Sequence, residues 1–120
     1  MMLIEMMKPD FVFEDERGSL RQLVQKGFSQ YNIIFSKKSV LRGNHFHKKN
    51  KEAFYVISGA FTLNVSKDGR KETYQFKQGD MFLVPPNVVH SFYYTQDCYI
   101  ASMYDIGVEN KDGSKDIYTE

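Results

Sequence analysis

Short runs of alternating apolar and polar residues, separated by turn-forming residues, are the feature that most constrains what this chain can fold into. No stretch of ten or more residues keeps an apolar face at helical spacing, and the ten Phe and eight Tyr residues favour strands. Regularly spaced short strands with Gly, Asn and Asp at their turns are typical of a sandwich or barrel, so we expect an all-β fold. The expected strands are Phe11–Glu14, Ser19–Val24, Gln30–Ser36, Glu52–Ser58, Phe61–Ser66, Glu72–Phe76, Met81–Val84, Ser91–Thr95 and Cys98–Tyr104.

The length of the chain limits the number of domains. Its 120 residues leave room for one domain. We expect this single domain over residues 1–107. The remaining residues, 108–120, are mostly polar, and we expect them to form a C-terminal tail that is loose or lies on a neighbouring molecule.

Composition narrows the possible partners and the cellular compartment. Sixteen Lys and Arg against fifteen Asp and Glu leave a net charge of +1, which gives no basic footprint for nucleic acid. The single cysteine, Cys98, excludes a disulfide framework and a thiolate-rich zinc site. The N-terminus is too short and too acidic for a signal peptide, and no apolar stretch reaches membrane length. We therefore expect a cytoplasmic protein that binds a small ligand or another protein and makes no membrane contact.

The expected strand Glu52–Ser58 is largely apolar on both of its faces. One face would pack into the core, and the other needs a cover outside the sheet. We expect a second copy of the chain to supply that cover, which predicts a homodimer. The alternative is an aromatic-rich outer surface that stays exposed.

The three histidines and one glutamate form the pattern with most chemical content. His45 and His47 alternate on a strand, so both imidazoles point to one face with Cα atoms about 7 Å apart. Glu52 reaches the same face only if residues 48–51 form a loop, and His90 follows a Pro-Pro-Asn turn. A lone histidine is usually a surface or core residue, but all three lie at ligand-like positions. Three imidazoles and a carboxylate suit Zn, Fe, Ni or Mn.

The same residues resemble the two motifs of the cupin superfamily. The first is His45-Phe46-His47, four residues, Glu52, six residues and Gly59. The second is Gly79, five residues, Pro85-Pro86-Asn87, two residues and His90. The resemblance implies a double-stranded β-helix, a jelly roll whose interior mouth holds the site, with His45, His47, Glu52 and His90 as metal ligands.

Further segments resemble cupins that act on nucleotide sugars. Segments 13–18, 28–32 and 40–45 are similar to the dTDP-4-dehydrorhamnose 3,5-epimerase family. That likeness implies His45 as catalytic base and, as contacts to the nucleotide diphosphate or sugar, Arg17, Gln30, Asn32 and Arg42. The chain also resembles the sugar-nucleotide 3,4-ketoisomerases and the zinc-binding cupin domain of capsular-polysaccharide epimerase–reductases. Glu52 stands where those ketoisomerases tend to carry Gln. Because a carboxylate supplies a charged metal ligand and an amide does not, Glu52 favours a likeness to the zinc-binding cupins.

The chemistry that these families share is the removal of a proton next to a carbonyl group. It needs a base, a group that stabilises the enolate oxygen and a donor that returns the proton. A bound metal can stabilise the enolate, and Tyr94 or Tyr104 can return the proton. His45 cannot bind a metal and act as base at once, and the ligand role is favoured because Glu52 and His90 complete the set.

The sequence therefore predicts a metal-binding cupin, with zinc as the first choice of metal. It would epimerise or isomerise a nucleotide-linked 4-keto-6-deoxy sugar for cell-surface polysaccharide. Two alternatives stay open: a metal-dependent oxygenase that acts on a small molecule, and a non-catalytic sugar-binding or regulatory cupin. The polar residues Arg17, Gln30, Asn32 and Arg42 favour the nucleotide sugar.

Overall fold

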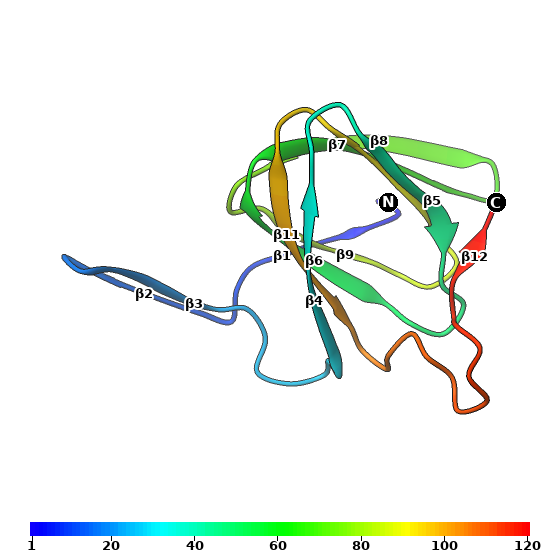
Figure 1. Ribbon diagram of the computed structural model, residues 1–120, viewed down its shortest axis with the longest axis horizontal. Coiled ribbons are helices and arrows are strands. Elements are labelled where there is room, and N and C mark those ends of the chain that lie inside the picture. Colours follow the sequence, from blue (N-terminus) through cyan, green and yellow to red (C-terminus); the bar gives the residue numbers. More distant parts are fainter.

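The computed structural model describes residues 1–120 and consists of strands without any helix, which confirms the all-β prediction (Figure 1). Two five-stranded antiparallel sheets form the body, in the orders β1-β9-β6-β11-β4 and β12-β5-β10-β7-β8, and β2 and β3 form a separate hairpin. No helix is available that could cross a membrane. The strands are β1 (Glu5–Met7), β2 (Phe11–Asp15), β3 (Gly18–Gln22), β4 (Gln30–Ser36), β5 (Leu41–Phe46), β6 (Glu52–Ser58), β7 (Ala60–Lys67), β8 (Arg70–Lys77), β9 (Met81–Val84), β10 (Val89–Tyr94), β11 (Cys98–Tyr104) and β12 (Tyr118–Thr119).

The strands with the strongest apolar patterns have the bounds that the sequence predicts. These are β4, β6, β9 and β11, which lie side by side in one sheet. The short edge strands β1 and β12 were not predicted. Each exists because it pairs with a longer neighbour, β1 with β9 and β12 with β5, and not because of its own side-chain pattern.

Aromatic side chains fill the space between the two sheets. Phe76 and Phe82 stack almost in parallel, with ring centroids 4.3 Å apart, and Phe61 packs against both. Phe54 and Phe92 continue this cluster, with ring centroids 5.2 Å apart, and both also lie within about 6.3 Å of the His90 ring. The aromatic core therefore packs directly against His90 of the candidate site.

The outer face of β6 is covered in part by the chain itself. Ala53, Met81, Leu83 and Met103 form a second buried cluster, against which Leu23, Val24 and Phe28 of the segment between β3 and β4 pack. The cover that we expected from a second subunit is thus partly intramolecular. Further along the same sheet the outward side chains stay exposed, and these are Tyr31, Ile33, Phe35, Ile57 and Tyr99.

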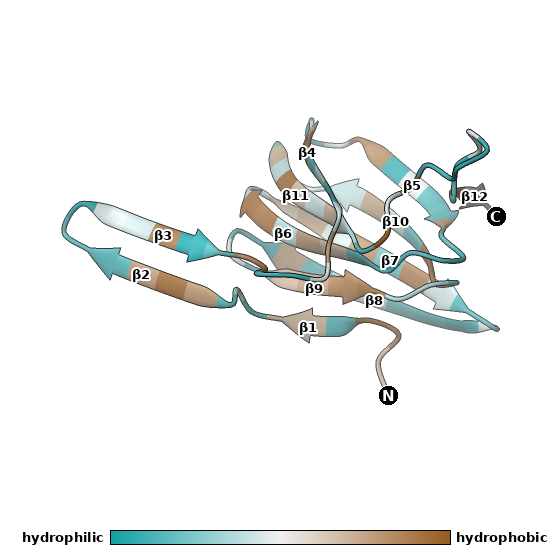
Figure 2. Ribbon diagram, turned by 90° about the horizontal axis from the view of Figure 1, so that it is seen from below, coloured by the Kyte–Doolittle hydropathy of each residue, from teal (hydrophilic) through white to brown (hydrophobic).

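The hairpin β2–β3 projects from the body of the molecule (Figures 1 and 2). Its strands pair only with each other. Several apolar side chains are about half exposed along it, and these are Phe11, Val12, Phe13 and Leu20. The hairpin therefore carries apolar surface that its own domain does not bury.

Residues 108–120 fold back onto the barrel of their own chain. Tyr118 pairs with Phe46 and Thr119 with His45, so that β12 extends the sheet beside β5. The Tyr118 ring also stacks on Phe46, with ring centroids 5.5 Å apart. Asp116 is fully buried despite the polar sequence around it. The segment closes the side of the barrel on which the histidines lie.

Candidate functional site

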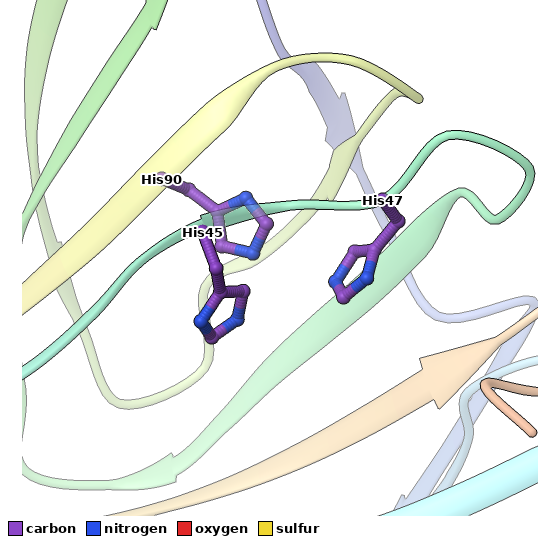
Figure 3. A group of neighbouring side chains, drawn as sticks. All are labelled: His45, His47 and His90. Carbon is purple, nitrogen blue, oxygen red and sulfur yellow. The ribbon is translucent and has the colours of Figure 1, made fainter. Parts of the chain in front are cut away.

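The three histidines meet inside the barrel. His45 comes from β5, His47 from the loop that follows it and His90 from β10 (Figure 3). Each offers a ring nitrogen, and these atoms all lie within 4.8 Å of one another. The sequence prediction that they converge agrees with this geometry.

A β-bulge places His45 opposite His90. His90 pairs with His45, but the next residue, Ser91, pairs with Gly43, so Asn44 is the extra residue on β5. Gly43 and Asn44 have φ values of 98° and 66°, in the left-handed region that glycine and asparagine adopt most easily. Bulges of this kind re-aim a side chain beside a site. Gly43 and Asn44 therefore allow the bulge that orients His45.

Glu52 joins the cluster from the start of β6 and is almost completely buried. Its Oε1 atom lies 3.0 Å from Nε2 of His47 and 3.6 Å from Nε2 of His90, and Ser102 donates a hydrogen bond to Oε2. Burial alone would raise the pKa of Glu52, but the hydrogen bond from His47, the nearby His90 imidazole and Ser102 hold it at about 2. Glu52 is therefore an anion at neutral pH.

His45 and His47 differ in their tendency to hold a proton. Burial lowers the pKa of His45 to about 4, and the neighbouring His90 and His47 act in the same direction. Burial also opposes the charge on His47, but its hydrogen bonds to Glu52 and to the Asp116 carbonyl outweigh that effect and raise its pKa. His45 therefore presents a neutral imidazole with a free lone pair at neutral pH.

The residues in this cluster fit a divalent metal. Nε2 of His90 is buried and has no hydrogen-bond partner, because its 3.6 Å distance from Glu52 is too long for one. A buried polar atom without a partner needs an explanation, and a metal ion is one. Imidazole nitrogens together with one carboxylate are ligands that Zn, Fe, Mn and Ni accept.

A cavity of about 270 Å³ opens beside the cluster. Its wall is mainly apolar, with Phe54 and Phe92 among its members, and Arg42 is its only basic residue other than the histidines. Pockets for drug-sized ligands measure roughly 300–1,000 Å³. The cavity therefore has room for one sugar-sized or ring-sized group next to the histidines, and a larger ligand would extend past Arg42.

Tyr94 and Tyr104 both line this cavity, in agreement with the inward direction predicted for Tyr94. Burial raises the pKa of Tyr94. Burial and the Glu52 carboxylate raise the pKa of Tyr104 further, and its ring meets that of His47 edge-on with centroids 5.1 Å apart. Both hydroxyls stay protonated at neutral pH, so each can donate a proton.

The other residues expected to contact a substrate lie outside the cavity wall. Arg17 is near the tip of the projecting hairpin, where it forms an ion pair with Asp15. The side-chain carbonyl of Gln30 accepts a hydrogen bond from the backbone of Val108. Asn32 is half-buried on β4. Of that set, only Arg42 lines the cavity.

Sequence reasoning missed the residues that support the cluster from a distance. Ser102 holds Glu52 from β11, and Ile117 lines the cavity from the C-terminal segment. Asp116 contacts His47 and the loop that follows it, although these residues are 66 to 69 positions away from it in the sequence. No local pattern marks these residues, because each acts through a contact between distant segments.

Curated proteins similar to this chain include dioxygenases. A 3-hydroxyanthranilate 3,4-dioxygenase from Danio rerio is 30% identical over 83 residues, which cover 68% of this chain and 29% of that protein. The enzyme of that name from Burkholderia cenocepacia is 48% identical over 40 residues, 33% of this chain and 23% of that protein. The chain thus spans less than a third of the length of these relatives.

Solved structures similar to this chain include enzymes of sugar nucleotides. A variant of a 3,4-ketoisomerase from Thermoanaerobacterium thermosaccharolyticum, in complex with TDP-4-keto-6-deoxyglucose, is 15% identical, with a TM-score of 0.80 over 100% of this chain and 89% of that one. A dTDP-4-dehydrorhamnose 3,5-epimerase from Elizabethkingia anophelis is 21% identical, with a TM-score of 0.72 over 92% and 72%. At these identities the likeness establishes the fold. The model of the cupin domain family matches residues 35–107, which contain the whole histidine and glutamate cluster, and the chain belongs to that family.

Proposed function

We propose that this chain is a metal-dependent isomerase that moves a proton next to the carbonyl of a nucleotide-linked 4-keto-6-deoxy sugar. The observation that carries the proposal is one cavity that combines the neutral imidazole of His45, two protonated phenols and a metal-compatible cluster. The similarity over the full chain to a fold that holds TDP-4-keto-6-deoxyglucose supports the choice of substrate class. Cell-surface polysaccharide synthesis in the cytoplasm is the setting that we propose for this reaction.

We assign different roles to the three histidines. Glu52 contacts His47 at 3.0 Å and lies 3.6 Å from His90, and two imidazoles with one carboxylate suffice to hold a metal. His45 is the most exposed of the three histidines, so it is left free to act as base. On the basis of this exposure we propose the base role for His45, in place of the ligand role that the sequence favoured. We keep the four-ligand set of His45, His47, Glu52 and His90 as the competing assignment.

The reaction that follows is a proton transfer with no net oxidation. The His45 imidazole takes the proton from the carbon next to the carbonyl, and the electron pair of that bond forms the enolate. A metal bound at the cluster would stabilise the negative charge on the enolate oxygen. The hydroxyl of Tyr94 or Tyr104 returns a proton to carbon, and His45 then reprotonates that tyrosine. The apolar wall of the cavity keeps bulk water away from the enolate.

Arg42 is the group that we propose for the anionic part of the substrate. It is exposed on β5, with Nη2 3.3 Å from the carbonyl oxygen of Phe35, and it lines the cavity. A guanidinium in this place can form paired hydrogen bonds to a diphosphate outside the cavity. Arg17, Gln30 and Asn32 do not line the cavity. We propose that they contact the substrate only if the assembly of two or more chains brings them to a cavity mouth.

The decisive assay for this function is deuterium exchange. With a panel of 4-keto nucleotide sugars in D₂O, we expect the metal-loaded protein to exchange one substrate C–H for deuterium without consuming oxygen. Arg42→Ala should raise the KM about 10- to 100-fold, because hydrogen bonds to charged groups contribute about 1.5–3 kcal/mol, and should leave the metal content unchanged. Absence of exchange with every member of the panel would contradict the proposal.

A second candidate function has its own support. The curated relatives are dioxygenases, and Glu52, His47 and His90 form the two-imidazole, one-carboxylate set that non-haem iron oxygenases use. A mainly apolar cavity of about 270 Å³ with Arg42 in its wall also suits a small aromatic acid. Oxygen uptake by the iron-loaded protein with such an acid, without deuterium exchange into nucleotide sugars, would favour this function.

We also propose a homodimer that buries the exposed outer face of β4 and β11. β4 is an edge strand, and Phe35 of β4 and Tyr99 of the neighbouring β11 form an exposed pair of rings with centroids 4.8 Å apart. Ile33 is 66% exposed on the same face. An exposed apolar edge strand favours pairing with another chain.

Light scattering tests this assembly. We expect a mass of about twice the 14.0 kDa of the chain for the unmodified protein and a monomer for Ile33→Lys combined with Tyr99→Lys. Leu41→Lys is the matched control, because Leu41 is equally exposed on the opposite sheet, and it should leave the dimer intact. A monomeric unmodified protein at micromolar concentration would rule out the dimer.

A further inference from the structure

Asp116 is a buried carboxylate in a segment that is otherwise mostly exposed. Its side-chain oxygens accept hydrogen bonds from the backbone N–H groups of Lys48, Lys49 and Asn50, at 2.9 to 3.0 Å. The side-chain amide of Asn50 donates a fourth, at 2.9 Å. Oδ1 accepts one of these four hydrogen bonds and Oδ2 accepts three, so Asp116 fixes the conformation of residues 48–50.

The loop that Asp116 holds connects two members of the candidate metal cluster. It begins directly after His47 and ends at Glu52, where β6 starts. Asn50, which is also buried, ties the loop to a third segment, because its side-chain oxygen accepts hydrogen bonds from Ile106 and Gly107. The spacing between His47 and Glu52 is therefore set by contacts from outside the loop.

The backbone of Asp116 contacts the His47 ring itself. Its carbonyl oxygen lies 2.7 Å from Nδ1 of His47. A carbonyl oxygen can only accept, so Nδ1 must carry a proton and donate it. The other ring nitrogen, Nε2, faces the interior of the cluster, where it donates to Glu52 at 3.0 Å and would bind a metal after releasing its proton. One residue thus fixes both the position of the His47 loop and the nitrogen that His47 presents to the site.

We propose that Asp116 is a positioning residue for His47, which keeps the proton on Nδ1 and presents Nε2 to the metal. The inference rests on the proposed function only in taking Nε2 of His47 as a metal ligand. Partners that orient a ligating histidine in this way usually contribute a 10- to 100-fold effect on metal affinity. The C-terminal segment, which the sequence analysis treated as a tail, is therefore part of the site.

The first arm of the test uses the unmodified protein without metal. In ¹⁵N-labelled protein, we expect one histidine Nδ1–H signal that exchanges slowly with water and disappears in His47→Ala. A His47 Nδ1 that is unprotonated at neutral pH, or that exchanges as fast as an exposed imidazole, would overturn the proposal. This arm gives its answer whether or not the protein binds a metal, so it separates the positioning role from the proposed function.

The second arm compares zinc affinities of variants by titration with Zn²⁺ alone. Asp116→Ala keeps the backbone carbonyl but removes the carboxylate that holds the loop in place beside it, so the affinity should fall by about 10- to 100-fold and the Nδ1 proton should exchange faster. Asp105→Ala is the matched control, because Asp105 also accepts a backbone N–H of this loop, from Lys51 at 2.9 Å, but contacts no histidine. It should change the affinity less than about twofold, within the range of ordinary surface substitutions.

Asp116→Asn covers the case in which the alanine variant does not fold. An amide keeps one oxygen acceptor but turns an NH₂ group toward the loop donors, so we expect a zinc affinity between those of the unmodified protein and Asp116→Ala. Unchanged affinity in a folded Asp116→Ala or Asp116→Asn variant, with the Nδ1 proton still protected, would refute the role assigned to Asp116.

Discussion

Replacing His47 with Ala and Glu52 with Gln together should remove bound metal from the purified protein. The two side chains are in contact, with the Glu52 carboxylate 3.0 Å from Nε2 of His47. Gln at position 52 keeps the shape but loses the anion, and Ala at position 47 removes an imidazole. The loss should exceed the roughly 100-fold effect of an outer partner, because two ligands are lost directly. Elemental analysis and Zn²⁺ titration measure it.

His45→Asn is the control that separates a ligand from a base. If His45 is the base, as we propose, His45→Asn should keep its metal and lose deuterium exchange by about 10²- to 10⁴-fold, the usual contribution of a positioned base. Loss of metal in His45→Asn would instead support the four-ligand assignment. Retention of metal at full occupancy in the His47 and Glu52 double variant would refute the cluster as the metal site in either form.

The sequence could predict the chemistry of the site because its strongest signals are local. His45, His47 and Glu52 lie within eight positions, and the alternation of side chains along a strand predicts that the two imidazoles share one face. His90 comes from a distant strand, and it was placed through a turn pattern that resembles a known motif. The structure brings these four side chains together, and their roles as ligands or base stay predictions.

The parts that could not be predicted depend on contacts between distant segments. Asp116 lies in a polar stretch that by composition is a tail, and it is buried only because four donors from residues 48–50 satisfy its carboxylate. Arg17 was expected to contact the substrate, but it lies on a hairpin that projects from the body of the molecule. No pattern within residues 11–22 indicates that this hairpin projects. The register shift at Asn44 depends equally on how β5 pairs with β10.

Gly43→Ala should damage the site without touching a ligand. A Cβ atom at position 43 would lie 2.8 Å from the carbonyl oxygen of His90 and 3.0 Å from Cα of Ser91, and both neighbours are backbone. The φ of +98° adds strain of about 1–2 kcal/mol for an L side chain. Since backbone cannot turn aside as a side chain can, β5 must move away from β10 and carry His45 with it.

Gly69→Ala isolates the effect of the backbone angle. Gly69 has a φ of +82°, but a Cβ atom there meets nothing within 4 Å, so this variant should lose only about 1–2 kcal/mol of unfolding free energy. Gly43→Ala should lose about 1–3 kcal/mol more, the usual cost of forcing atoms into a packed contact, as measured by urea unfolding. It should also lose deuterium exchange, while Gly69→Ala keeps it. Equal stability and equal exchange in the two variants would show that the bulge at Gly43 and Asn44 does not position His45.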